Sequence, residues 1–287
     1  MEQLGYRVRF SAHCNLRWGY AAGRPDERAH DLEASFADPA VDAVLCLGGG
    51  HASSQVLRHL DYDVIAEHPK PFVGFSDITA LHAAIGREAN LVTFWGPMFA
   101  QLATAAASTR ADVLRALTAA EPLGIVDPEA PPARTLVEGV AEGELVGGTL
   151  SRVSALLGTP WEIDVRGKIL LLEDVREEPC RVDCFLTHLL NAGKLEECSG
   201  ICLAEFTNCG ARAVDPLAGE TSLTPDEVFA HVIEPLGIPT VYGLALGHGR
   251  RLATVPLGVR ARLDARAGRL ELLDAALRPE GPTRRAF

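Results

Sequence analysis

The chain has 287 residues, of which 47% are hydrophobic and 23% are charged, and its formal net charge is -11. This length accommodates two domains of ordinary size, and the composition is typical of a globular protein in water. The pI near 5.3 argues against nucleic acid as a partner, because phosphate binding needs basic surface. No apolar run approaches the roughly 20 residues of a membrane helix, and the N-terminal sequence MEQLGYRVRFSAH lacks the pattern of a secretory signal. We therefore expect a cytoplasmic protein that does not bind membranes.

The seven cysteines form an odd set, which does not fit a disulfide framework. Cys180 and Cys184 are four residues apart, as are Cys198 and Cys202, whereas zinc knuckles have a shorter gap between their ligands. On a helix, a spacing of four places both thiols on one face. This pattern predicts buried, reduced thiols, and we expect no metal site here.

The first part of the chain alternates short apolar runs with helical patterns. We expect strands at 6–10, 41–50, 72–75 and 91–95, and helices at 25–39, 53–60 and 77–90. Apolar strands that alternate with amphipathic helices predict a parallel sheet with helices on both faces. Ligands bind such sheets beyond the carboxyl ends of the strands. Glycines 48–50 and Ser76 both fall at such ends.

The second part begins after residues 121–135, which carry four prolines and no periodicity, as is typical of a linker. We therefore expect an N-terminal domain over 1–120 and a C-terminal domain over 136–287. Glycine-punctuated alternation at 135–148 predicts twisted antiparallel strands. Beyond it we expect strands at 167–174 and 200–206, helices at 181–193 and 224–237, and two strands within 251–273 joined by 264–268.

Ser76 stands between the apolar run FVGF and a helical pattern, in the sequence G-F-S-D. A serine in this place is a common helix N-cap. The turn also resembles part of a nucleophile elbow, although Ile78 stands where the motif G-x-S-x-G has its last glycine. Ser53 and Ser54 follow the glycine turn and compete for the role of nucleophile. The residues alone leave these alternatives open.

A serine hydrolase also needs a general base, a group that orients the base, and an oxyanion hole. Among the nine histidines, only His248 lies between two glycines, in G-H-G. Such a loop lets an imidazole project from the end of a strand. Glu173 ends the apolar run KILLLED, where a carboxylate would be held rigidly. His248 and Glu173 are therefore candidates for the base and for the group that orients it, although these features alone do not select them over other residues.

Six stretches, in one order, resemble the serine LD-carboxypeptidases, to which the microcin C immunity peptidases are related. They are GYAAGRPDERAHDLEASFADPAVDAVLCLGGG, LDYDVIAEHPKPFVGFSDITALH, LVTFWGPMF, GELVGGTLSRVSALLGTPWE, GKILLLEDVREEPCRVD and YGLALGHGRRLATVPLGVRARLD. The expected fold class is α/β. It has an N-terminal Rossmann-like or flavodoxin-like domain with a parallel sheet, and a C-terminal mixed α/β domain of the swivelling β/β/α type.

The resemblance implies a Ser-His-Glu triad made of Ser76, His248 and Glu173, spread over the two domains. It also implies an oxyanion hole made of the backbone N–H groups of Asp77 and Gly49. In this mechanism the serine attacks the scissile carbonyl, an acyl-enzyme forms, and water releases it. The implied mechanism requires no metal and no cofactor.

The implied substrate is the murein tetrapeptide, a small peptide from which the terminal D-alanine is removed during cytoplasmic recycling of the cell wall. The resemblance also implies a homodimer. The microcin branch cleaves peptidyl or aminoacyl nucleotide analogues and carries an added loop with an aromatic residue. No such insertion stands between Gly147 and Glu173, which favours the carboxypeptidase. A third alternative is a binding protein that has lost catalysis together with its N-terminal strand.

Three features depart from the family pattern. The family begins roughly thirty residues earlier, with a strand and a Pro-Ser loop. Because loss of a central strand would leave backbone groups unpaired, we expect that an N-terminal segment is missing from this sequence. Trp95 replaces the usual histidine of T-F-H-G-P, a change expected to reshape the pocket. His51 lies in the turn G-G-H-A-S, where the family has G-G-Y-G-S, and we expect it to be an exposed loop residue.

Overall fold

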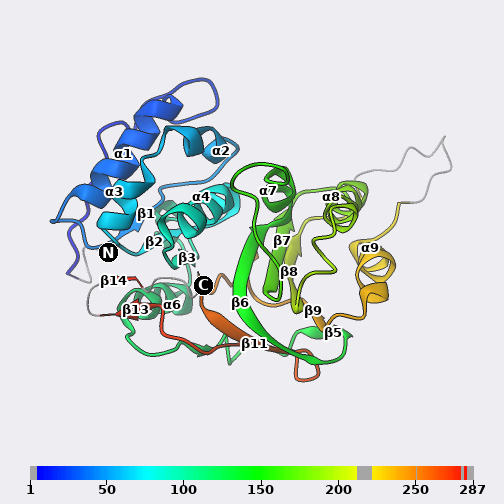
Figure 1. The fold of residues 1–287 in the computed structure, drawn as a ribbon. Coiled ribbons are helices and arrows are strands. Elements are labelled where there is room, and N and C mark those ends of the chain that lie inside the picture. The colour runs from blue at the N-terminus through cyan, green and yellow to red at the C-terminus, as the bar shows by residue number, and fades with distance from the viewer. Residues whose placement is uncertain (1–4, 212–221, 250, 279–280, 283–287) are drawn as a thin grey trace.

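The structure is a computed structural model that describes residues 5–211, 222–249, 251–278 and 281–282. Two lobes lie side by side, each built around its own sheet (Figure 1). Helices α1 to α4, blue to cyan, surround the N-terminal sheet, and helices α7 to α9 lie along one side of the larger sheet. Within the described ranges, no helix is long and apolar enough to cross a membrane.

The N-terminal sheet has the strand order β1-β2-β3-β10. Its first three strands are parallel, and β10 returns from the far end of the chain to pair antiparallel with β3. The strands are β1 (Val44–Leu45), β2 (Phe72–Gly74), β3 (Thr93–Trp95) and β10 (Val255–Leu257). The helical segments are α1 (Pro25–Ala37), α2 (Ser53–Val56), η2 (Leu57–His59), α3 (Tyr62–Glu67), η3 (Ser76–Ile78), α4 (Thr79–Ala84), η4 (Ile85–Ala89), α5 (Phe99–Leu102) and α6 (Ala107–Thr118).

The larger sheet has the strand order β4-β12-β11-β6-β7-β8-β9-β5. Its centre, β6 to β9, is parallel, and its flanking strands are antiparallel. The strands are β4 (Gly124–Ile125), β5 (Arg134–Val137), β6 (Val140–Thr149), β7 (Ile169–Val175), β8 (Gly200–Thr207), β9 (Thr240–Tyr242), β11 (Arg260–Asp264) and β12 (Arg269–Leu272). The helical segments are α7 (Leu150–Ala155), α8 (Pro179–Asn191), α9 (Pro225–Val232) and η5 (Glu234–Leu236), and β13 (Leu277–Arg278) pairs with β14 (Gly281–Pro282).

Strand β7 is buried on both faces, which explains its continuous apolar sequence. Ile169 and Leu171 belong to a core that extends into the N-terminal lobe. Leu170 and Leu172 belong to a second core, which lies under α7, α8 and α9. Because successive side chains of a strand point to opposite faces, β7 separates these two cores and contributes to both.

The mixed α/β class is confirmed, and most predicted elements are present. Helices cover the predicted segments 25–39, 53–60, 77–90, 181–193 and 224–237, and strands lie within 72–75, 91–95, 167–174 and 200–206. The strand predicted at 41–50 is present but short, as β1. The domain boundaries at 120 and 136 stay a prediction, although β4 shows that part of the proline-rich segment pairs with β12.

The strand predicted at 6–10 is wrong, because these residues form no strand. The side chains of Tyr6 and Phe10 are 44% and 62% exposed, and the ring of Phe10 packs edge-on against Phe99. A sequence with strand propensity becomes a strand where a neighbouring strand and a half-buried face are available. Residues 6–10 pair with no such neighbour in the described part of the chain.

Two further predictions of pairing were incomplete. The hairpin across 264–268 is confirmed as β11 and β12, but residues 251–273 also contain β10, which belongs to the other sheet. The segment 135–148 does form strands, β5 and β6, yet these two do not pair with each other. Strand β6 is antiparallel to β11 and parallel to β7, and β5 pairs with β9. Such partners lie far away in sequence.

Candidate active site

Ser76 lies just beyond the carboxyl end of β2, on a tight turn into η3, with φ +62°. This left-handed conformation is uncommon for a residue other than glycine and is found at functional sites. Gly74 allows the turn, because a Cβ there would lie 2.7 Å from Cγ2 of Ile78. Thr79 Oγ1 donates to the carbonyl of Ser76 at 2.7 Å. The segment therefore has the strained strand-to-helix turn of a nucleophile elbow without its last glycine.

His248 connects Ser76 to Glu173. Its Nε2 lies 3.0 Å from Ser76 Oγ, and its Nδ1 lies 2.7 Å from Glu173 Oε2. An ionised carboxylate only accepts hydrogen bonds, so Nδ1 carries the hydrogen and Nε2 is the acceptor that faces the serine hydroxyl. Thr149 Oγ1 donates to the other oxygen of Glu173. The carboxylate is fully buried, and the imidazole is 17% exposed.

The two acids near the end of β7, Glu173 and Asp174, face opposite ways. Glu173 shares the face of Leu171 and reaches His248, whereas Asp174 points to the helices. The Asp174 carboxylate accepts the backbone N–H of Ser151, in the first turn of α7, at 2.8 Å. Burial raises the pKa of Asp174 to about 6. One carboxylate thus contacts the imidazole, and its neighbour holds the start of a helix.

The imidazole is fixed by its loop and by an aromatic ring. Gly247 has φ +114°, and a Cβ there would lie 2.8 Å from Glu173 Oε2, so only glycine suits this position. The ring of Phe75 lies 4.7 Å from the ring of His248, centroid to centroid. Phe75 also packs edge-on against Trp95 at 5.4 Å, and Trp95 is fully buried. The tryptophan therefore supports the ring that contacts His248.

The glycine turn lies against the serine. A Cβ on Gly49 would be 3.6 Å from the Cβ of Ser76, so the turn lies next to the side chain of Ser76. The side chain of Asp77 accepts the backbone N–H groups of Ala52 and Ser53, each at 2.8 Å. These bonds hold the turn and the elbow in one position relative to each other.

The structure separates the competing serines. Ser53 is buried and holds Asp77 through its backbone, and Ser54 is exposed. The hydroxyl that the structure brings to His248 is that of Ser76. His51 is exposed, as predicted.

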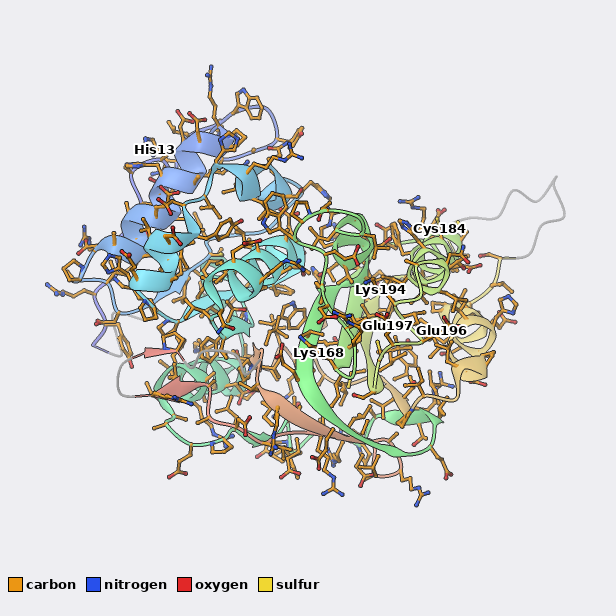
Figure 2. All side chains as sticks on the ribbon, viewed as in Figure 1. His13, Lys168, Cys184, Lys194, Glu196 and Glu197 are labelled. Atoms are coloured by element: carbon orange, nitrogen blue, oxygen red, sulfur yellow. The ribbon has the colours of Figure 1, made fainter. Side chains whose placement is uncertain are left out.

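The cysteine prediction needs a correction. All seven cysteines are free, but Cys180 and Cys184 are exposed on α8, and Figure 2 shows Cys184 at the outer surface. Cys198 and Cys202 are buried, and Cys202 lies in β8. Spacing on a helix fixes a shared face but not which face is buried. In the described part of the chain, no group of three or more His, Cys, Asp and Glu side chains could hold a metal ion.

Sequence reasoning missed Thr149 and Phe75. Thr149 pairs with Glu173 in the register of β6 and β7, so its role follows only from the pairing of two strands. Phe75 precedes the serine, and the sequence indicated only that it belongs to an apolar run. The sequence G-G-T at the end of β6 could have indicated Thr149 as a site residue, because ligands bind at the carboxyl ends of parallel strands.

Comparison with known proteins gives the same family across most of the chain. Residues 1–96 match the LD-carboxypeptidase N-terminal domain and residues 142–263 match the LD-carboxypeptidase C-terminal domain. The probable murein peptide carboxypeptidase of Bacillus subtilis (strain 168) is 39% identical over 267 residues, which is 92% of this chain and 82% of that protein. The murein tetrapeptide carboxypeptidase of Pseudomonas aeruginosa is 30% identical over 276 residues, 92% of this chain and 86% of that protein.

A solved structure agrees. The MccF-like protein of Bacillus anthracis superposes with a TM-score of 0.84 at 28% identity, covering 95% of this chain and 88% of that one. The fold, the matched domains and the two relatives all lead to one assignment. The chain belongs to the LD-carboxypeptidase family.

Proposed function

We propose that this protein is a serine-type LD-carboxypeptidase that removes the terminal D-alanine of murein tetrapeptides, a step in recycling of the cell wall. Membership of the family supports a peptidase. The names of its relatives, murein peptide and murein tetrapeptide carboxypeptidase, support the substrate. The observation that carries the mechanism is the continuous hydrogen-bonded series Ser76, His248 and Glu173.

In the first step, His248 Nε2 takes the proton of Ser76 as Oγ attacks the scissile carbonyl. The separation of 3.0 Å is within the range for such a transfer. Glu173 holds the tautomer in which Nε2 is unprotonated and stabilises the imidazolium that forms. Because Glu173 is fully buried, its charge acts on the imidazole with little screening by water.

Negative charge then develops on the carbonyl oxygen. The backbone N–H of Asp77, which follows the nucleophile, and that of Gly49 are assigned to the oxyanion hole. The position of Gly49 next to Ser76 supports this assignment. So do the hydrogen bonds that the Asp77 carboxylate accepts from the backbone N–H groups of Ala52 and Ser53, just after the turn. Each such donor is worth about 3 kcal/mol of transition-state stabilisation in other hydrolases.

The intermediate collapses as His248 gives its proton to the leaving nitrogen, and free D-alanine departs. The remaining tripeptide is joined to Ser76 as an ester. A water molecule, deprotonated by His248, attacks this ester and releases the tripeptide carboxylate together with the serine. Every proton in this route passes through His248, so the route is complete without a metal ion or a cofactor.

The second candidate is a peptidase of the microcin immunity type. The likeness to the MccF-like protein favours it. Against it stands the expectation from the sequence that no loop is inserted between Gly147 and Glu173, where residues 156–168 connect α7 to β7. The third candidate, an inactive binding protein, fits poorly with a serine, a histidine and a glutamate already within hydrogen-bonding distance. Assembly as a homodimer stays a prediction.

The test compares release of D-alanine from murein tetrapeptide with cleavage of an aminoacyl sulfamoyl adenosine. A tetrapeptide that ends in L-alanine is the matched control substrate, and Ser76→Ala is the control enzyme. We expect release of D-alanine from the natural tetrapeptide and little cleavage of the L-alanine isomer. Cleavage of the nucleotide analogue alone would overturn the proposed substrate and support the second candidate.

A further inference from the structure

The loop that carries His248 lies between two carboxylates from neighbouring strands. Glu173 lies near the end of β7 and contacts the imidazole. Glu205 lies near the end of β8, which pairs with β7, and its backbone N–H donates to the carbonyl of Leu246 at 3.1 Å. The loop therefore crosses the ends of both strands and is attached to each.

Each glycine of G-H-G makes room for one of these carboxylates. At Gly247, φ is +114° and a Cβ would meet Glu173. Gly249 is different, because its φ lies outside the left-handed region, so its backbone would accept other residues. A Cβ at Gly249 would, however, overlap the carboxylate of Glu205. At position 249 the Glu205 carboxylate, and not the backbone conformation, therefore stands in the way of a side chain.

The carboxylate of Glu205 lies in an unfavourable place. Burial raises its pKa, the charge of Glu173 raises it further, and the backbone N–H of Gly249 opposes both effects. Tyr242 of β9 also lies within reach of its charge. One oxygen of Glu205 is buried without a hydrogen-bond partner among the described residues. A buried oxygen without a hydrogen-bond partner lowers the stability of the fold. Proteins tolerate such a loss of stability at sites that serve their activity.

We propose that Glu205 is a positioning residue: its carboxylate holds the backbone of Gly249 and so keeps the imidazole of His248 directed at Ser76. This inference rests on the proposed function, because it takes His248 as the base. Glu205 does not touch the reacting atoms and acts only through the loop. A displacement of about 1 Å at a reacting group can reduce the rate about a hundredfold, so a support of this kind has a measurable effect.

The experiment is a double-mutant cycle on Glu205→Ala and Gly249→Ala. We expect each single variant to lower kcat about tenfold or more, with KM within about twofold, because the loop moves while substrate contacts remain. The double variant should be little slower than either single one, since the new methyl group then occupies the space of the lost carboxylate. Glu205→Gln, whose amide oxygen still accepts a hydrogen bond, should stay within about threefold of the wild type. If the fold-reduction of kcat in the double variant equals the product of the two single reductions, the proposal is overturned.

Two controls separate this effect from general damage. Gly247→Ala would meet Glu173 and not Glu205, so its methyl group cannot fill the space left by Glu205→Ala, and combining the two changes should lower kcat further. The second control is Glu144→Gln, which should leave kcat unchanged. Glu144 lies in the middle of β6 and pairs with Lys168, labelled in Figure 2, at 3.3 Å. Melting temperatures show which variants fold. A folded Glu205→Ala variant with the wild-type kcat would overturn the proposal.

A second readout separates this proposal from the proposed substrate. The rate at which a fluorophosphonate labels Ser76 reports how well the base activates the serine and needs no peptide. If the wild type is labelled but releases no D-alanine, the proposed substrate is wrong. The labelling rates of the variants then take the place of kcat in the double-mutant cycle and test the role of Glu205. A folded wild type that is neither labelled nor active would overturn both proposals.

Discussion

The backbone N–H of Thr149 donates to Oγ1 of Thr79 at 3.1 Å, and this bond joins the strand beside Glu173 to the helix behind Ser76. The two backbones approach closely because Gly148 has φ +143° and carries no side chain. A Cβ there would lie 2.5 Å from Thr79 Oγ1. The proposed nucleophile and the proposed acid of the triad come from different sheets, and this contact joins the segments that carry them.

Replacing Thr79 by valine tests this connection. The threonine hydroxyl accepts the N–H of Thr149 and donates to the carbonyl of Ser76. Its loss should lower the free energy of unfolding by about 1–3 kcal/mol and kcat by about tenfold. Urea unfolding and steady-state kinetics measure both. The matched control is Thr118→Val on α6, where the hydroxyl donates to the carbonyl of Leu114 in the same helix. Equal kcat in Thr79→Val and the wild type would contradict the role of this contact.

Ser76→Ala should abolish hydrolysis, with a fall in kcat of about a thousandfold or more. The change is small, so the variant should fold, as circular dichroism can verify. Ser53→Ala and Ser54→Ala should remain active because neither hydroxyl contacts His248. Near-normal turnover by Ser76→Ala would place the nucleophile elsewhere, and these two serines would be the next to examine.

Glu173→Gln should slow the reaction less than Ser76→Ala does, because an orienting carboxylate is partly dispensable. The loss arises because a neutral amide stabilises the imidazolium poorly. Thr149→Val removes the hydroxyl that bonds to the same carboxylate and should cause a smaller fall in kcat. If Glu173→Gln and the wild type turn over at comparable rates, Glu173 is not the third member of the triad.

A histidine beneath the elbow should make stability depend on pH. His82 Nε2 donates to the carbonyl of Gly74 at 2.8 Å, and burial lowers the pKa of His82 from 6.5 to about 4. In this window the unfolded chain binds a proton that the folded chain does not bind. The stabilisation by His82 is therefore present above pH 6.5 and is lost as the pH falls towards 4, by a few kcal/mol. Urea unfolding should show a smaller loss across this window for His82→Gln than for the wild type, and equal losses would contradict this account.

Local patterns predicted the helices and the buried strands. The spacing of apolar residues and the residues that begin or end a helix can both be recognised within a short stretch of sequence. The strand predicted at 6–10 and the unpredicted β10 show where this information ends. Whether a segment becomes a strand depends on a partner, and the partner of β10 lies more than a hundred residues away, in β3.

The same limit applies to the site. Ser76, His248 and Glu173 were each candidates by residue type and place, yet only the order of the surrounding motifs selected them together. Thr149 and Glu205 were not found, because their roles follow from the strand register of the larger sheet and from the path of the loop over it. Those are contacts between segments distant in sequence.

The mass of the peptide that contains Ser76 shows directly whether this serine forms an acyl-enzyme. Wild-type protein is mixed with murein tetrapeptide, quenched rapidly with acid and digested. We expect this peptide to gain the mass of a tripeptide acyl group, which is the tetrapeptide without its D-alanine. Ser76→Ala should gain no mass and release no D-alanine. An acyl group on another residue, or release of D-alanine by Ser76→Ala at the wild-type rate, would contradict this expectation.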